Sequence, residues 1–452
     1  MRIHFIAIGG AAMHNLAIAL KGKNYIVSGS DDVINDPSKS RLMKYGLLPK
    51  KDGWDAEKIS KELDAVILGM HAKADNPELL RARELNVKIF SYPEFIFNQS
   101  KNKFRVVIGG SHGKTTITSM ILHVMNFNNI EVDYMVGAQL KGFDVMVKIT
   151  EENKFIILEG DEYLTSPIDL RPKFHLYKPD LALISGIAWD HINVFPTYEI
   201  YLEQFKIFID SIQKNGTLVY NSDDIDLNSM VKRTTNKINK VPYNTPSYFV
   251  KNNVTYLDIK NKNIPLKIFG KHNLNNLMGA KFICQQMGID EDNFFKAIIS
   301  FDGASNRLEL ICKNLNSIAY KDFAHSPSKV LATASAVRSQ NSDKKIVACL
   351  ELHTYSSLNI DFINQYKNAL NPADEAIIFY SKKALKLKGM KDLIDNEIKT
   401  AFNHKNLTVI NNNKDLINYL SSLEYFNLAL LMMSSGEFEG LDLGIINDFM
   451  KK

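Results

Sequence analysis

The chain has 452 residues, of which 45% are hydrophobic and 23% are charged, and it carries a formal net charge of +5. These values are typical of a globular protein, and at about 150 residues per domain the length predicts three domains. The charge is modest and the lysines are scattered, which argues against a nucleic-acid partner, and no stretch approaches the roughly 18 apolar residues of a membrane span.

The amino terminus and the cysteines indicate the compartment. The chain runs from Met1 straight into a strand pattern, without the charged, apolar and small-residue segments of a signal peptide. Cys284, Cys312 and Cys349 lie in separate apolar contexts and lack the paired spacing of a zinc site or a disulfide framework. We therefore expect a reduced, cytoplasmic protein without membrane insertion.

Short β-type runs alternate with helical patterns over the first hundred residues. We expect a helix over residues 11–20 and strands over residues 3–8, 25–28, 65–68 and 87–90. This alternation predicts parallel α/β structure. The polar stretch that follows, at residues 98–103, predicts a domain boundary near residue 100.

A turn between the first strand and the first helix is a candidate anion site. Backbone N–H groups at this helix start can bind a diphosphate, and they belong to Gly9, Gly10, Ala11, Ala12 and Met13. Asp31 closes the second strand, where an acid often binds a ribose or a base. The dinucleotide fingerprint is not satisfied, because Ala7 and Ala12 occupy two of its informative places, so a nicotinamide cofactor is only weakly indicated. A tight turn without a ligand is the alternative.

A second strand-to-helix turn carries the strongest motif. The apolar run at residues 106–108 leads into a glycine-rich turn, and the residues that can surround phosphate oxygens are Gly110, Ser111, His112, Gly113, Lys114, Thr115 and Thr116. Lys114 supplies a positive charge, and the Thr115 hydroxyl can hold Mg²⁺. Ile108 stands where the common phosphate loop has its first glycine, so this loop is a shorter variant. The alternative is an ordinary turn that contains Gly-Lys-Thr.

Acidic and imidazole groups follow the next strands, which we expect over residues 155–158, 181–184 and 217–220. We expect the carboxyl ends of parallel strands to deliver these groups to the edge that carries the phosphate loop; they are Glu159, Asp161, Glu162 and His191. Glu159 and His191, with Thr115, could hold a metal against phosphate. Taken singly, Asp161 and Glu162 could instead start a helix, and His191 could be a satisfied, partly buried histidine.

The segment from about 222 to 268 is rich in Asn, Lys and Thr and predicts a peripheral antiparallel excursion. A helix then opens at His272, where Asn273 and Asn276 share a face and could read a base edge. Helix N-capping explains one of these asparagines but not the whole set.

A third α/β section starts near Arg307, with strands expected over residues 345–350, 376–380, 407–410 and 428–433. Arg307 could clamp a transferring phosphate, and Asp322 could accept from a ribose hydroxyl. Each could instead belong to a hinge ion pair.

Read in order, these motifs, completed by Asp322-Phe-Ala-His325, resemble those of the Mur ligase family over the whole chain. The resemblance implies a Rossmann-like UDP-binding domain over residues 1–100, a central P-loop-type ATP-binding domain over 101–305 and a Rossmann-like domain over 306–452 that binds the incoming amine or peptide. It implies ATP and Mg²⁺ as cofactors and UDP-N-acetylmuramate as a substrate. Under this resemblance the nucleotide is held by the phosphate loop together with His272, Asn273, Asn276, Arg307, Asp322 and His325.

The resemblance also implies the chemistry. The lactyl carboxylate of UDP-N-acetylmuramate takes the γ-phosphoryl group of ATP, and an amine then attacks the acyl phosphate to form an amide. Lys114, His191 and Arg307 are the expected catalytic residues. The expected metal ligands are Thr115, Glu159 and His191, and the expected substrate contacts are Gly9 to Met13, Asp31, Asp161 and Glu162.

The identity of the amine divides the family. Residues 159–179 and 37–42 resemble the muropeptide-recycling branch, which predicts the tripeptide L-Ala-γ-D-Glu-meso-diaminopimelate as acceptor. The alternative is free L-alanine, since residues 351–356 lack the family's arginine and residues 434–440 replace a more glycine-rich loop. A non-ligating, nucleotide-gated binding protein is the alternative from another class.

Two further expectations concern Lys206 and assembly. Lys206 lies about fifteen residues beyond His191, near where other family members carry a carbamylated lysine, and we interpret it as a helix-surface lysine. We expect a monomer or a weak dimer.

Overall fold

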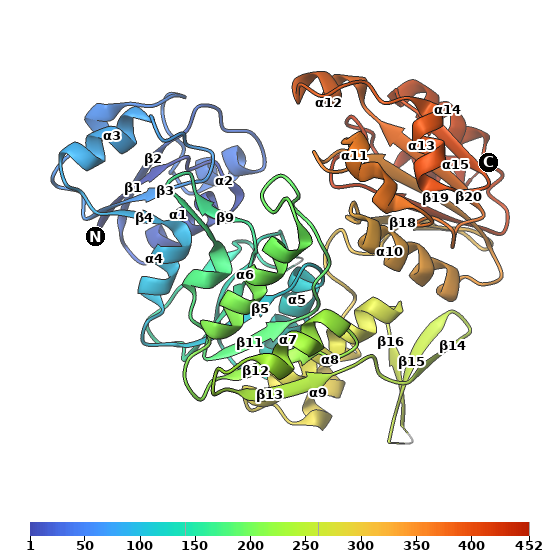
Figure 1. The fold of residues 1–452 in the computed structure, drawn as a ribbon, viewed down its shortest axis with the longest axis horizontal. Coiled ribbons are helices and arrows are strands. Elements are labelled where there is room, and N and C mark those ends of the chain that lie inside the picture. Colours follow the sequence, from blue (N-terminus) through green and yellow to red (C-terminus); the bar gives the residue numbers. More distant parts are fainter. Residues whose placement is uncertain (141, 261, 452) are drawn as a thin grey trace. The chain divides into compact units, whose positions relative to one another are not determined.

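A computed structural model describes residues 1–140, 142–260 and 262–451 of the chain (Figure 1). The described residues form three parallel-rich sheets and two small antiparallel ones, so the predicted α/β class is confirmed. The chain divides into two compact units. The first unit holds Met1–Ile187, Thr197–Asn244 and Gly279–Phe294, and the second holds Ala188–Pro196, Thr245–Met278 and Phe295–Lys452.

The amino-terminal sheet has four parallel strands in the order β2 (Ile26–Ser30), β1 (Arg2–Ile6), β3 (Ala65–Leu68), β4 (Ile89–Ser91). Its connecting helices are α1 (Ala11–Gly22), α2 (Ser38–Lys44), α3 (Pro77–Glu84) and α4 (Tyr92–Gln99). The first strand ends two residues before the predicted end, because Ala7 takes a left-handed conformation with φ of 68°. That turn directs the chain into the Gly9–Gly10 loop.

The central sheet has seven strands. Their order is β13 (Asn239–Tyr243), β12 (Thr217–Asn221), β11 (Leu181–Ile184), β5 (Phe104–Gly109), β8 (Phe155–Glu159), β6 (Asp133–Met135), β7 (Val147–Lys148). All neighbours are parallel except β6 and β7. Helices α5 (Lys114–Phe127), α6 (Tyr198–Asp210) and α7 (Ile225–Arg233) belong to the crossovers. The interior strands are continuous apolar runs, as a sheet buried on both faces requires.

The predicted antiparallel excursion over residues 222–268 is correct only in part. Helix α7 and strand β13 belong to the central parallel sheet, and only β14 (Tyr248–Lys251), β15 (Val254–Ile259) and β16 (Lys262–Leu266) form an antiparallel sheet. The polar composition misled the prediction, because β13 is an edge strand that needs few apolar side chains. A short hairpin, β9 (Leu164–Ser166) with β10 (Asp169–Pro172), follows β8.

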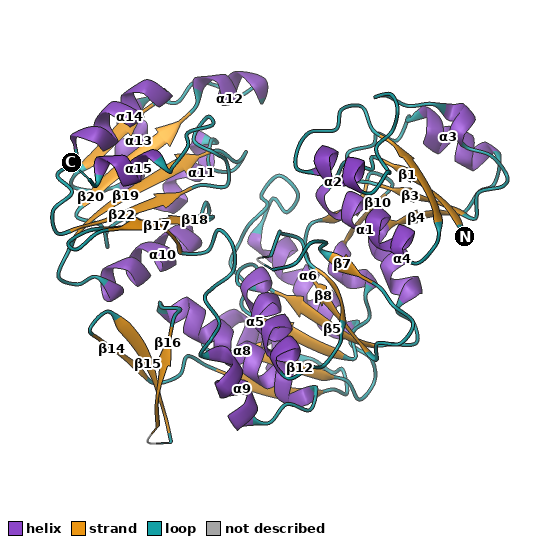
Figure 2. Ribbon diagram, turned by 180° about the vertical axis from the view of Figure 1, so that it is seen from behind, coloured by secondary structure: helices purple, strands orange, loops and turns teal. Residues whose placement is uncertain are grey.

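The carboxy-terminal sheet has six strands, in the order β17 (Glu309–Lys313), β18 (Ile318–Asp322), β22 (Leu428–Met433), β19 (Lys345–Leu352), β20 (Glu375–Tyr380), β21 (Leu407–Ile410). Only the β17–β18 pair is antiparallel. Apolar residues of α10 (Pro327–Gln340) and α13 (Asp395–Phe402) pack on one face, and those of α14 (Asn413–Ser422) and α15 (Ile445–Phe449) on the other (Figure 2). The remaining helices are α8 (Lys271–Gln286), α9 (Glu291–Ile298), α11 (Ile360–Ile363) and α12 (Lys382–Leu387).

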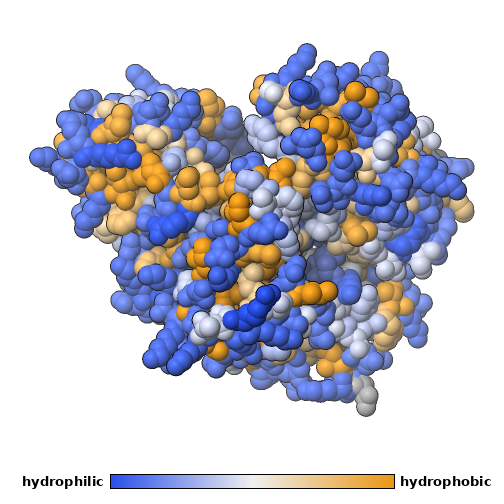
Figure 3. Space-filling view, in the orientation of Figure 1, coloured by the Kyte–Doolittle hydropathy of each residue, from blue (hydrophilic) through white to orange (hydrophobic). Residues whose placement is uncertain are grey.

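The surface is predominantly polar on the face that Figure 3 presents, where hydrophobic residues form small groups among hydrophilic ones. Within residues 1–140, 142–260 and 262–451, no helix combines the length and the apolar character that crossing a bilayer requires.

A buried ion pair links the amino ends of β5 and β6, which lie on either side of β8 in the central sheet. Lys103 precedes β5, and its Nζ lies 2.9 Å from Oδ2 of Asp133 at the start of β6. Asp133 is fully buried and also accepts hydrogen bonds from the backbone N–H and hydroxyl of Thr150 and from the amide of Asn153. Every oxygen of this carboxylate therefore has a partner, which is what allows a charge to be buried here.

We expect Asp133→Ala to destabilise the first unit by about 3–5 kcal/mol, since it leaves the Lys103 ammonium buried without its anion. Glu131→Ala is the matched control, because Glu131 is 72% exposed and pairs with Lys148 at the surface; its effect should stay within about 0.5 kcal/mol. Differential scanning calorimetry of both variants checks the prediction. Equal melting temperatures for the two would contradict it.

Candidate functional site

The phosphate-loop motif lies at the carboxyl end of β5, in the middle of the central sheet. The loop spans Gly110 to Gly113, and Lys114, Thr115 and Thr116 form the first turn of α5. Gly110 has φ of 123° and Gly113 has φ of 80°, conformations that favour glycine. The loop leads into the start of a 14-residue helix, where the helix dipole favours an anion.

The neighbouring strand holds this loop in place. The N–H of Ser111 donates to the carbonyl of Gly186, 3.0 Å away, and the Ser185 hydroxyl donates to the carbonyl of His112. Ser185 and Gly186 follow β11, which pairs with β5 in parallel register. The loop backbone is therefore positioned by two strands rather than by its own sequence alone.

Two of the three predicted metal ligands lie together. The Thr115 hydroxyl donates to Oε1 of Glu159 at 2.7 Å, and the N–H of Gly137 donates to the other carboxylate oxygen at 2.8 Å. Glu159 ends β8, which pairs with the other side of β5. A hydroxyl and a carboxylate oxygen at the mouth of a phosphate loop are the hard ligands that Mg²⁺ prefers. His191 belongs to the second unit, and its part in this ligand set stays a prediction.

The other two acids of the Glu159–Glu162 segment hold lysines. Asp161 lies 2.5 Å from Nζ of Lys173, and Glu162 lies 2.5 Å from Nζ of Lys114. Burial opposes the charge of both lysines, but the nearby carboxylates outweigh it and hold the pKa of Lys114 and of Lys173 above the ordinary value. That Asp161 and Glu162 contact the substrate stays a prediction.

The amino-terminal turn is built around Asp31. The N–H of Gly9 donates to Oδ2 of Asp31 at 2.7 Å, so the acid that closes β2 lies beside the predicted anion site. Met13 is buried in the core and Ala12 is half-buried, so any ligand contact there would come from their backbones, whereas Ala11 is exposed. Nδ1 of His14 lies 2.9 Å from the carbonyl oxygen of Gly10 and donates to it in the tautomer that carries the proton on Nδ1.

Burial raises the pKa of Asp31 to about 6, and a hydrogen bond with Asp32 adds to the shift while lowering the pKa of Asp32. Of the two acids, Asp31 is the one whose pKa is shifted toward holding a proton.

The remaining predicted nucleotide residues all lie in the second unit. Asn273 and Asn276 are buried at the start of α8, where the amide of Asn273 donates to the carbonyl of Phe269 at 3.0 Å. Burial lowers the pKa of His272, against the opposing charge of Asp322, and its buried Nδ1 has no partner among the described residues. A buried ring nitrogen of this kind is available to a polar ligand.

Asp322 has several hydrogen-bond partners within the protein. Its carboxylate accepts from the N–H groups of Leu308 and Ala324, each at 2.7 Å, and from the hydroxyl of Thr333 at 3.3 Å. Three of its roughly four acceptor positions are thus occupied within the protein, where Asp322 fixes the β18–α10 turn, and its contact with a ribose hydroxyl stays a prediction.

Arg307 and His325 flank that turn. The Arg307 guanidinium lies over the ring of Phe323, 4.8 Å from its centroid, and remains partly exposed. Burial lowers the pKa of His325 to about 4, and its Nδ1 lies 2.8 Å from the carbonyl of Phe323. One guanidinium nitrogen of Arg307 donates to the carbonyl of Asn306 at 3.1 Å, and a contact between Arg307 and phosphate stays a prediction.

Two motifs that depart from the family pattern meet in the second unit. Glu351 is the penultimate residue of β19. It lies beside the loop after β22 and accepts from the Ser434 hydroxyl and from the N–H of Phe438 at 2.9 Å. Burial opposes ionisation, but hydrogen bonds from His353, Ser434 and Phe438 outweigh it and hold the pKa of Glu351 below its ordinary value. Sequence reasoning did not predict this contact, because residues 351 and 434 are brought together only by the pairing of β19 with β22.

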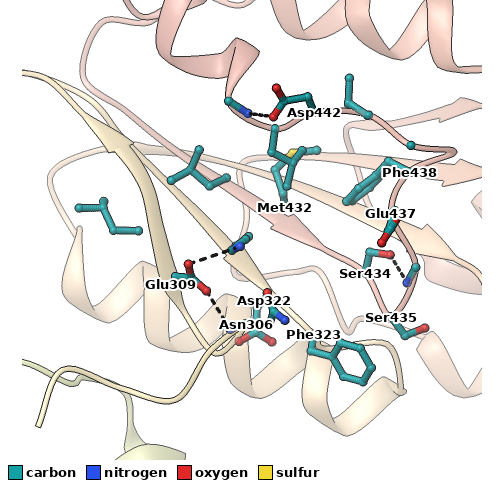
Figure 4. A pocket seen from close by; sticks show the side chains of 18 residues that line it. Asn306, Glu309, Asp322, Phe323, Met432, Ser434, Ser435, Glu437, Phe438 and Asp442 are labelled. Atoms are coloured by element: carbon teal, nitrogen blue, oxygen red, sulfur yellow. Dashed lines mark hydrogen bonds and ion pairs between the residues drawn. The ribbon is translucent and has the colours of Figure 1, made fainter. Parts of the chain in front are cut away.

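The same loop borders a cavity of about 650 Å³, which Figure 4 shows. Asp322, Phe323 and Ser434 line it together with the Lys321–Glu309 ion pair, whose charged atoms lie 3.4 Å apart. The cavity therefore lies at the carboxyl end of the third sheet, in the part of the chain predicted to bind the amine.

Lys206 lies on α6 as predicted, with its side chain 58% exposed and its ammonium 3.4 Å from Glu203. Tyr201, on the same helix, was missed by sequence reasoning. It is fully buried, and its hydroxyl contacts both Ser111 and Glu162. The available signal was a tyrosine at a helix position expected to face the core, because a tyrosine hydroxyl usually finds a hydrogen-bond partner when it is buried.

Comparison with known proteins gives the following. The chain matches the model of the Mur ligase family, catalytic domain, over residues 2–103 and that of the Mur ligase middle domain over residues 108–284. It is 30% identical over 394 residues to the UDP-N-acetylmuramate–L-alanine ligase of Clostridium botulinum, covering 83% of this chain and 82% of that protein.

Solved structures share the fold over the full length. The UDP-N-acetylmuramate–alanine ligase of Thermotoga maritima superposes with a TM-score of 0.70 at 19% identity, covering 100% of this chain and 98% of the other. The murein peptide ligase of Psychrobacter arcticus gives a TM-score of 0.66 at 20% identity, covering 100% and 99%.

The Asp31 titration yields a test of the amino-terminal turn. The pKa of Asp31 is raised from 3.8 to about 6, so ionisation of Asp31 disfavours the folded state. The resulting loss of folding stability develops as pH rises from about 4 to about 6. Asp31→Asn does not titrate and keeps an acceptor for Gly9. Its melting temperature relative to the unmodified protein should therefore rise between about pH 4 and pH 7.

Asp36→Asn is the control for this measurement, because hydrogen bonds from Ser40 lower the pKa of Asp36 and confine its titration to lower pH. Its relative melting temperature should stay level above about pH 5. If the relative melting temperature of the Asp31 variant stays level or falls over this pH range, the pKa of Asp31 is not raised in the folded protein.

Proposed function

Since the chain belongs to the Mur ligase family, whose members are ATP-dependent ligases that form amide bonds in peptidoglycan synthesis, we propose that it joins L-alanine to the lactyl carboxylate of UDP-N-acetylmuramate. The observation that carries the proposal is the phosphate loop with Lys114 and Thr115 set against Glu162 and Glu159. This arrangement supports transfer of a terminal phosphoryl group of ATP.

The acceptor in this proposal is not the tripeptide that residues 159–179 predict. The curated relatives support the alternative, because they bear the name of an L-alanine ligase. The likeness to the murein peptide ligase is one of fold alone at 20% identity. We therefore take free L-alanine as the acceptor, with the tripeptide as its competitor in the assay.

The proposed reaction begins when a lactyl carboxylate oxygen attacks the γ-phosphorus of ATP. An O–P bond forms, the bond from the γ-phosphorus to the β,γ-bridging oxygen breaks, and ADP leaves. The amine of alanine, having lost a proton, attacks the acyl carbon, and inorganic phosphate leaves with the electrons of the C–O bond. The protein needs no covalent nucleophile, because alignment and charge neutralisation carry the reaction.

This chain's residues divide that work. The Lys114 ammonium would neutralise oxygens of the terminal phosphates, and Arg307 would add a second cation from the third sheet. Thr115 and Glu159, with His191 as the predicted third ligand, would hold Mg²⁺, which when bound neutralises phosphate charge. In the amino-terminal sheet, the N–H groups at Gly10 to Met13 would bind the diphosphate of UDP-N-acetylmuramate, close to Asp31.

We assign three parts of the chain to three substrates, as the sequence predicts. Residues 1–100 would bind the uridine nucleotide, residues 101–305 would bind ATP, and residues 306–452 would bind the amine. Each assignment is supported by a parallel-rich sheet of its own, with the candidate residues after the carboxyl ends of its strands.

Lys114→Ala should reduce substrate-dependent ADP release by at least about 100-fold, since it removes the cation nearest the transferring phosphate. A coupled ADP assay measures this. Lys206→Ala is the matched control and should keep its turnover, because that lysine is a surface residue paired with Glu203. Unchanged turnover in the Lys114 variant would refute the assigned loop.

The acceptor is tested by supplying purified protein with ATP, UDP-N-acetylmuramate and an equimolar mixture of L-alanine and tripeptide. Mass spectrometry should find the alanine adduct as the main product. If the tripeptide adduct dominates instead, the tripeptide is the acceptor and the proposal of L-alanine is wrong. ATP hydrolysis without either amide would indicate the non-ligating binding protein.

A further inference from the structure

The phosphate-loop lysine is paired with an acid of the same unit. Nζ of Lys114 donates to Oε2 of Glu162 at 2.5 Å and to the carbonyl of Gly110 at 2.7 Å, and its side chain is only 14% exposed. A phosphate-loop lysine reaches the terminal phosphates of a bound nucleotide. Glu162 therefore occupies the partner position that a phosphate oxygen would take.

Glu162 is held firmly in that position. Its side chain is 1% exposed, and its second oxygen lies 3.3 Å from the hydroxyl of Tyr201. The same hydroxyl lies 2.8 Å from the hydroxyl of Ser111, inside the phosphate loop. Because Tyr201 is fully buried on α6, the phenol connects the loop, the acid and the helix in one network.

The three neighbouring carboxylates have separate partners. Glu159 accepts from Thr115 and from the N–H of Gly137, and Asp161 pairs with Lys173. Only Glu162 pairs with Lys114 among the described ion pairs.

Charge balance explains why a counter-ion is present. A buried ammonium without an anion is strongly destabilising, and Glu162 supplies the anion while the site holds no phosphate. When the terminal phosphates of ATP arrive, two anions compete for one lysine, and the phosphate bears more charge. An ammonium has three donors, of which Glu162 and Gly110 take two, so a phosphate that accepts from more than one of them displaces Glu162 at a cost in affinity for nucleotide.

Resting on the proposed function, we infer that Glu162 is a placeholder anion for the terminal phosphates of ATP and that Tyr201 is the residue that positions it. Nucleotide binds by exchange: the Lys114 ammonium passes from the Glu162 carboxylate to a phosphate oxygen. The pair thus makes the empty loop stable and lowers its affinity for anions weaker than a triphosphate.

The test is equilibrium binding of ATP by calorimetry, with and without Mg²⁺, to the full chain and its variants. Glu162→Gln keeps the shape of the side chain and removes its charge, so ATP should bind about three- to tenfold more tightly in both conditions. Tyr201→Phe, which removes the hydroxyl that holds the carboxylate, should tighten binding in the same direction by a smaller factor. Glu203→Gln, an exposed acid on α6, is the control and should leave the dissociation constant unchanged.

Each result has one meaning. Weaker or unchanged ATP binding by a folded Glu162→Gln overturns the inference, and weakening confined to the presence of Mg²⁺ overturns it in favour of a metal ligand. If Glu162→Gln does not fold, the test passes to Tyr201→Phe. ATP binding by Tyr201→Phe that is no tighter than that of the unmodified protein overturns the role of Tyr201. Failure of the unmodified protein to bind ATP would instead refute the proposed function itself.

Discussion

The candidate site depends on the parallel pairing of β5 with β8 on one side and β11 on the other. This register places Glu159 beside the end of β5 and places Ser185 and Gly186 beside the phosphate loop. Parallel strands end at one edge, so three loops from distant parts of the sequence converge there. The buried Lys103–Asp133 pair links the amino ends of β5 and β6, on either side of β8 in the same sheet.

Charge neutralisation is the second constraint on this edge. Lys114 and Lys173 are each paired with a carboxylate from the short segment after β8. An empty anion site surrounded by buried cations would be unstable, and the acids of this segment provide the balance. A phosphate-transfer site and a stable resting protein are thus compatible because the same lysine can exchange one anion for another.

Much of this could be predicted from the sequence, because its signals are local. Strands such as Ala65–Leu68, Leu181–Ile184 and Leu428–Met433 match their predicted bounds, since unbroken apolar runs of that length suit buried parallel strands. The errors are local too: the polar edge strand β13 was taken for an excursion, and β1 stopped early at Ala7. Family membership followed from the order of the motifs, and the acceptor did not, since it depends on a few side chains of the third sheet.

By itself the sequence determined the alternation of strands and helices, the glycine-rich loop before Lys114 and the residue types that follow each strand. Only the tertiary structure decided the partners: Glu162 and Tyr201 for Lys114, Asp31 for the N–H of Gly9, and Ser434 for Glu351. The reason is that the periodicity of side chains depends on residues close together in the sequence, whereas strand order and register depend on packing between segments that are far apart in it. For a site assembled from several strands, the sequence therefore gives the residue types, and only the tertiary structure gives the contacts between them.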